Sequence, residues 1–253
     1  MLLAYWNVVH PSFPLLDSLP LPQQEQRNPV LLAAMCVMAA PFATESTDTL
    51  RKTLSYYAAQ AIQIERRHPK IEIVEAALIF IQRHAIIHRA PTTPGLWAEI
   101  GSIVGMCHEL GLNVNPSSWN ITSKHRNRRV QLWWAVYIFD KFCSFNLGRP
   151  SYINEDNASV PLLSLEHFNQ HDPFVPQTSR QHFIALAVLA VILSRLLSTF
   201  YSLSSVEKLR HTTPQDIHKL FVSFQKQLLD FKVEHIDALH ATEEVIDSRG
   251  ELI

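Results

Sequence analysis

The residue with the clearest chemical potential is an aspartate inside an apolar stretch, RRVQLWWAVYIFDKFCSFNLGRP, which runs from Arg128 to Pro150. Bulky apolar residues surround Asp140 there, so its carboxylate must lose much of its hydration. It is either a general acid or metal ligand, or one half of a structural ion pair. No second carboxylate or histidine stands at a useful helical spacing, which favours the ion pair.

Arg149 is the nearest strong partner for this carboxylate. Gly148 allows the chain to turn back at the end of a helix, and Pro150 prevents the helix from continuing. We therefore expect Arg149 to fold back and to form a charge-assisted pair with Asp140.

The densest basic run is KHRNRR, from Lys124 to Arg129. Such a run can contact phosphates or act as a nuclear address. The alternative is a solvated first helical turn that leads into the apolar stretch. Six residues without interleaved aromatic side chains are weak support for nucleic-acid binding, so the alternative is favoured.

Two other groups could bind a metal or react. His84 and His88 are spaced i, i+4, which suits a shared metal ion, but the glutamate of an HExxH motif is missing. Three isolated cysteines, Cys36, Cys107 and Cys143, rule out a disulfide scaffold and favour a reducing compartment. They are best explained as buried thiols, and no metal site is expected.

Helices must position these residues almost throughout the chain. The sequence is 47% hydrophobic and 18% charged, holds only six glycines, and nearly lacks strand-type alternation. The fold class is therefore all-α, a multi-helix orthogonal bundle or helical array in a single large domain. Helices are expected at residues 2–9, 29–40, 50–68, 71–89, 96–110, 126–147, 183–203 and 214–240. Residues 1–205 would form the domain and residues 206–253 its C-terminal helical extension.

Two further properties narrow the function classes. The net charge of −1 gives no electrostatic footprint for nucleic acid over the whole chain. The best membrane-span candidate, residues 183–203, has an uninterrupted apolar core of only about half the roughly 20 residues that a span needs. We expect it to be a buried helix, and we expect no membrane contact.

The stretch around Asp140 resembles the fungal-specific transcription factor domain. This is the middle homology region of fungal zinc-cluster transcription factors, also called the xylanolytic transcriptional activator regulatory domain. Other segments from about residue 2 to 203 are similar to it in the family's order. The signature residues that match are Arg128, Arg129, Leu132, Trp133, Trp134, Tyr137, Asp140, Gly148, Arg149, Pro150 and Pro161. Lys141 departs from the usual arginine, which should be tolerated if its side chain is exposed.

The resemblance also implies a module that this chain is expected to lack. Family members bind DNA through a six-cysteine zinc cluster that precedes the regulatory domain. Three cysteines cannot build that cluster, so zinc ion binding and DNA binding belong to the family, and no cofactor is expected in this chain.

The implied function is that of a regulatory domain, not of an enzyme, which modulates transcription through a DNA-binding module or partners. Expected partners are transcriptional co-regulators, a full-length relative and a small-molecule effector, with DNA bound only indirectly. The nucleus is the expected location, with the cytoplasm as the alternative for a chain without the zinc cluster. The alternative function is an all-α small-molecule-binding protein or enzyme with a buried pocket. Its mark would be a convergent set of ionisable residues around one cavity, and only Asp140, Arg149 and His108 are candidates.

Overall fold

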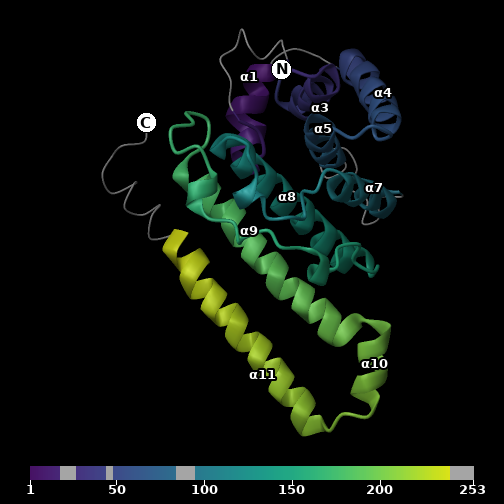
Figure 1. Cartoon of the computed structure of the whole chain (residues 1–253), viewed down its shortest axis with the longest axis vertical. Helices are drawn as coiled ribbons and strands as arrows, with labels where there is room; N and C mark the ends of the chain where they lie inside the picture. The colour runs from purple at the N-terminus through teal and green to yellow at the C-terminus, as the bar shows by residue number, and fades with distance from the viewer. Residues whose placement is uncertain (18–26, 44–47, 84–94, 240–253) are drawn as a thin grey trace.

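The computed structural model describes residues 1–17, 27–43, 48–83 and 95–239, and every regular element in these ranges is helical (Figure 1). The all-α prediction is confirmed. The α-helices are α1 (Leu2–Ala4), α3 (Pro29–Ala39), α4 (Asp48–Glu65), α5 (Ile71–Ile81), α7 (Leu96–Glu109), α8 (Ser123–Leu147), α9 (Gln177–Leu196), α10 (Leu203–Arg210) and α11 (Pro214–Phe231).

The helix expected at 214–240 is α-helical only to Phe231 and continues as a π-helix over Lys232–Asp237, and the one expected at 71–89 is described as far as Ile81. Two helices begin earlier than expected. Helix α8 begins at Ser123, earlier than expected, because the Thr122 side chain accepts a hydrogen bond from the His125 backbone N–H at 3.3 Å and caps it. The expected helix at 183–203 begins earlier, at Gln177, directly after Pro176. It also ends in a π-helical turn over Leu197–Tyr201 before α10 starts.

The core is centred on two helices, α5 and α8, whose side chains are buried on nearly all faces over part of their length. In Figure 1, α8 crosses the middle of the molecule, with α3, α5 and α7 on one side and α9 on the other. Helix α5 is buried from Ile73 to Ile81, and α8 from Val130 to Ile138. Both are long apolar runs without a polar face, as expected for helices that are enclosed by protein.

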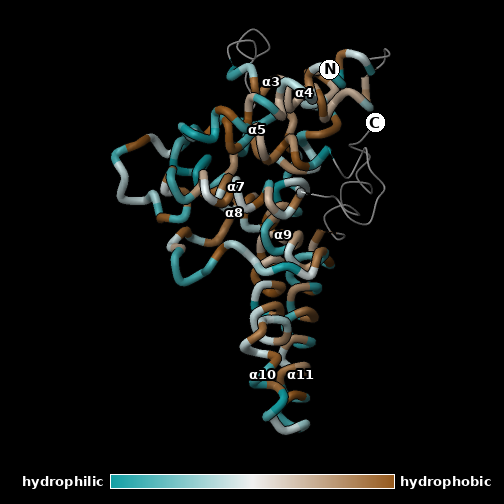
Figure 2. Tube along the Cα trace, turned by 90° about the vertical axis from the view of Figure 1, so that its right-hand side faces the viewer, coloured by the Kyte–Doolittle hydropathy of each residue, from teal (hydrophilic) through white to brown (hydrophobic). Residues whose placement is uncertain are grey.

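Helices α9, α10 and α11 form a narrow projection from this body, which Figure 2 shows most clearly. Helix α11 returns along α9 and contacts it. The prediction that residues 183–203 form a buried helix is therefore wrong for the outer half, since only 28% of the most apolar window of Gln177–Tyr201 is buried. This segment, whose most apolar 18-residue window has a mean hydropathy of 2.3, is long and apolar enough to cross a membrane by length and composition only.

The N-terminal segment inserts a histidine into an aromatic cluster. The ring of His10 lies 4.5 Å from that of Trp6, and no surface of His10 is exposed. Neither ring nitrogen has a hydrogen-bond partner in the part of the chain that is described. Burial lowers the pKa of His10 from 6.5 to about 4, although the negative charge of Asp172 opposes the shift.

This burial makes stability depend on pH. Between pH 6.5 and about 4 the unfolded chain protonates His10 while the folded chain keeps it neutral, so stability falls as the pH falls. We expect His10 to account for a loss of about 2–3 kcal/mol between pH 7.5 and 4.5. Urea unfolding at both pH values should show that His10→Phe removes this contribution, whereas the exposed control His211→Phe keeps it. An unchanged pH dependence in His10→Phe would contradict the assignment.

Candidate functional site

The carboxylate of Asp140 is fully buried and is bound by the segment that follows α8. The Ser151 hydroxyl donates to Asp140 Oδ2 at 2.5 Å. The backbone N–H groups of Tyr152 and Ile153 donate to its two oxygens at 2.8 and 3.1 Å. Asp140 therefore holds the chain where it turns back along the helix.

The buried side chain of Lys141 binds two of the loop residues that Asp140 binds. Its side chain is 2% exposed, and Nζ donates to Ser151 Oγ at 2.5 Å and to the Ile153 carbonyl oxygen at 2.8 Å. The ammonium group also lies 3.4 Å from Asp140 Oδ2 and 4.8 Å from the centre of the Tyr137 ring. The exposure under which this lysine was expected to be tolerated is therefore not met, and buried hydrogen bonds accommodate it instead. Asp140, Lys141 and Ser151, with the backbone of residues 152 and 153, are called the Asp140 clamp below.

The predicted Asp140–Arg149 pair is also wrong. The turn itself is as expected, because Gly148 has φ of 60° and the Arg149 N–H donates to the Ser144 carbonyl oxygen at 3.0 Å. The Arg149 side chain is exposed, however, and forms no ion pair with any residue in the described ranges. The chain beyond Pro150 brings a serine and two backbone amides to the carboxylate instead.

A serine beside a lysine can be a nucleophile and its base. In the clamp, Ser151 Oγ is engaged by both Asp140 and Lys141. Burial lowers the pKa of Lys141, and the charge of Asp140 opposes that shift. None of these residues lines the charged cavity described below or the two other well-defined cavities considered in the described ranges. The arrangement therefore supports loop positioning better than catalysis.

The aromatic signature residues anchor the same loop further along. Trp134 Nε1 donates to the Pro161 carbonyl oxygen at 2.8 Å, and the Tyr137 hydroxyl donates to Glu155 Oε1 at 2.5 Å. Leu132 and Trp133 are buried in the core. On the other side of the loop, Trp97 Nε1 of α7 donates to the Pro150 carbonyl oxygen at 3.0 Å. At both Pro150 and Pro161 the backbone carbonyl oxygen accepts the hydrogen bond of a tryptophan indole.

In the basic run at the start of α8, Lys124 and His125 are exposed in the first turn, whereas the three arginines are partly buried. The solvated-turn interpretation therefore holds for the first two residues and needs correction for the arginines. Arg126 donates to the carbonyl oxygens of Trp119 and Ile121. Arg129 donates to the Leu110 carbonyl oxygen at 2.9 Å and lies over the Trp119 ring. These cations tie α8 to the preceding loop.

Arg128 binds two carboxylates of α5. Its Nε and Nη2 atoms donate to the two oxygens of Glu75 at 2.6 and 2.7 Å, and Nη2 lies 3.2 Å from Glu72 Oε1. Glu75 is 1% exposed. Burial raises the pKa of Glu75, while Arg128 opposes the rise through its hydrogen bonds and charge.

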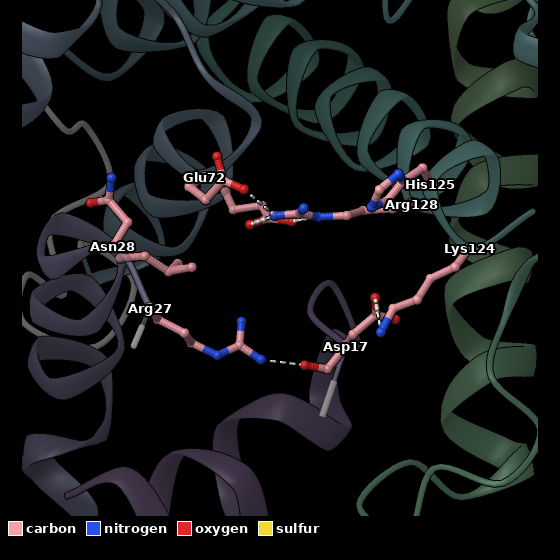
Figure 3. Close-up of a pocket in the computed structure, with 9 residues that line it drawn as sticks. Asp17, Arg27, Asn28, Glu72, Lys124, His125 and Arg128 are labelled. Atoms are coloured by element: carbon pink, nitrogen blue, oxygen red, sulfur yellow. Dashed lines mark hydrogen bonds and ion pairs between the residues drawn. The ribbon is translucent and has the colours of Figure 1, made fainter. Parts of the chain in front are cut away.

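These three side chains form one wall of a cavity of about 450 Å³ between the N-terminal ends of α3, α5 and α8 (Figure 3). Across from them, Arg27 donates to the backbone oxygen of Asp17, and Lys124 Nζ lies 3.4 Å from Asp17 Oδ2. Six charged residues define this charged cavity, Asp17, Arg27, Glu72, Glu75, Lys124 and Arg128, and His125 also lines it. A second cavity of about 360 Å³ shares Asp17, Lys124 and Arg128 with it.

Sequence reasoning missed this convergence because the six residues come from four separate segments. One signal was present: Glu72 and Glu75 stand three residues apart in a very apolar helix, and a buried glutamate needs a cation. The candidates named from sequence, Asp140, Arg149 and His108, do not line the cavity.

The histidine pair and the three cysteines are the other groups that the sequence suggested for metal binding or reactivity. His84 and His88 lie outside the described residues. Cys107 and Cys143 are buried as predicted, and Cys36 is partly buried. The described ranges contain no group of three or more His, Cys, Asp or Glu side chains that could hold a metal ion.

Fold and sites together define a class: an all-α domain whose signature residues hold a loop, with a separate charged cavity. Comparison with known protein families identifies one family for this chain. The chain belongs to the fungal specific transcription factor domain family, whose model matches residues 2–228.

Individual relatives are transcriptional regulators. The chain is 31% identical over 108 residues to transcriptional activator protein DAL81 of Saccharomyces cerevisiae. The aligned stretch covers 42% of this chain and 10% of that protein. It is 24% identical over 227 residues to cutinase transcription factor 1 alpha of Fusarium vanettenii, covering 82% and 25%. The chain thus spans about a tenth to a quarter of these relatives. No solved structure is significantly similar to it.

Proposed function

We propose that this domain regulates transcription through a zinc-cluster DNA-binding module, attached or on a partner chain, in the nucleus and without catalysis. The family match over residues 2–228 carries the proposal. The structure supports it, because the family-signature residues engage one another, the core and the following loop. Co-regulators or a full-length relative are the proposed protein partners.

A reporter assay tests this role. The chain is fused to a heterologous zinc-cluster module, and transcription from the cognate site is compared with that of the module alone. We expect the domain to change reporter output while DNA affinity stays that of the module. Purified unfused chain should bind duplex DNA negligibly. A chain that binds DNA alone with a steep salt dependence, or that leaves the reporter unchanged, would contradict the proposal.

We also propose that a small-molecule effector is an input to this regulation. The specific observation is the charged cavity, which has the convergent ionisable residues expected of a ligand site. Its volume falls within the usual range for small-molecule sites.

A further inference from the structure

The charged cavity carries opposite charge on opposite walls. Figure 3 shows Glu72 and Arg128 on one side and Arg27 with Asp17 on the other, with Lys124 extending from α8 towards Asp17. The lining includes three carboxylates, three lysine or arginine cations and the imidazole of His125. What matters for a ligand is how those charges are divided.

The α5 wall is net negative. Glu72 and Glu75 stand beside one guanidinium on this wall, that of Arg128, which leaves the wall with one excess negative charge. The charge of Arg27, on the opposite wall, also acts on Glu75. Both oxygens of Glu75 are bound by Arg128, whereas the Glu72 side chain is 38% exposed and makes the longer contact, at 3.2 Å. Glu72 is therefore the carboxylate that a ligand cation can reach.

The opposite wall is net positive. Arg27 and Lys124 outnumber the carboxylate of Asp17 by one charge. Helices α3 and α8 begin here, at Pro29 and Ser123, and neither has an acidic residue in its first turn. Their N-terminal dipoles add positive potential to that of the side chains.

The ion pair on this wall is exchangeable. Lys124 Nζ and Asp17 Oδ2 are 3.4 Å apart, and the lysine side chain is 61% exposed. An exposed pair of this kind contributes little to stability, so a ligand carboxylate can take the place of Asp17 at low cost.

We propose that the charged cavity binds a small zwitterion, with its carboxylate at Lys124 and Arg27 and its cationic amine at Glu72. The inference rests on the proposed effector function and names its ligand class. A ligand of this charge pattern meets complementary charge at both ends. A dianion would meet Glu72, and a dication would meet Lys124, and like-charge contacts of this kind exclude the wrong partner.

Three six-carbon probes that differ only in their end groups test the charge pattern: 6-aminohexanoate, adipate and 1,6-diaminohexane. Isothermal titration of the full chain should show the zwitterion binding at least about tenfold more tightly than the other two, equivalent to about 1.4 kcal/mol. Lys124→Gln and Glu72→Gln should each weaken its binding by about tenfold. Lys219→Gln, which alters an exposed pair with Asp216 on α11, should not change it.

Three outcomes would overturn the inference: equal or tighter binding of adipate or the diamine, no binding of any probe at millimolar concentration, or equal weakening by the α11 control. Circular dichroism establishes that each variant is folded. The reporter assay separates this inference from the proposed function. A chain that regulates the reporter but binds no probe refutes only the ligand class. A chain that binds 6-aminohexanoate but does not affect transcription refutes the regulatory role.

Discussion

Replacing Asp140 by alanine is expected to lower the free energy of unfolding by about 3–5 kcal/mol. The substitution leaves the ammonium group of Lys141 buried without its counter-charge. It also removes the acceptor for the backbone N–H groups of Tyr152 and Ile153, which hold the chain after α8. A buried donor that loses its partner costs its full desolvation free energy.

Urea denaturation followed by circular dichroism measures this effect, and Arg149→Ala is the matched control. Because Arg149 is exposed, its replacement should change the free energy of unfolding by no more than about 0.5 kcal/mol. If the two substitutions cost the same, the pair predicted from sequence would be correct and the clamp wrong. The double variant Asp140→Leu, Lys141→Met should recover part of the loss, since it removes both buried charges.

The second large effect is expected at the ion pair between α5 and α8. Arg128→Met should cost about 3–5 kcal/mol at pH 8, because it leaves the buried carboxylate of Glu75 without the cation that hydrogen-bonds to both of its oxygens. Lys124→Met, in the same basic run but largely exposed, should cost less than about 1 kcal/mol.

The pH dependence of the Arg128→Met variant identifies the cause. Burial raises the pKa of Glu75, and the variant lacks the main opposing influence. In the folded variant Glu75 then takes up a proton at a higher pH than it does in the unfolded chain. The free energy of unfolding therefore increases as the pH falls towards the pKa that Glu75 has in the unfolded chain. The cost of Arg128→Met should therefore be smaller at pH 5 than at pH 8. Equal costs at both pH values would show that lost packing, and not the uncompensated charge, dominates.

Much of the fold could be predicted from residue pattern, because a helix is stabilised by contacts between neighbours in the chain. The all-α class and the glycine-capped end of α8 follow from apolar periodicity, proline positions and Gly148. The sequence also predicts that Asp140 has a partner, because a buried carboxylate needs a hydrogen-bond donor or a cation. The division of the chain at residue 205 stays a prediction.

The identity of each partner depended on the tertiary structure. Arg149 is close to Asp140 in sequence, but the path of the chain beyond Pro150 brings Ser151 and two amide groups to the carboxylate and leaves Arg149 in solvent. The same reasoning applies to Lys141, whose burial depends on the loop that covers it. Composition could not show that Arg128 serves Glu75 on another helix.

By itself, the sequence determined the helical class, the buried signature helix and the family, since all three depend on residue types in a fixed order along the chain. Only the tertiary structure decided which charges meet. The charged cavity draws on residues 17, 27, 72, 75, 124 and 128, whose distance along the chain says nothing about their distance in space. Helix packing brings them together, and electrostatic interaction depends on that spatial distance alone.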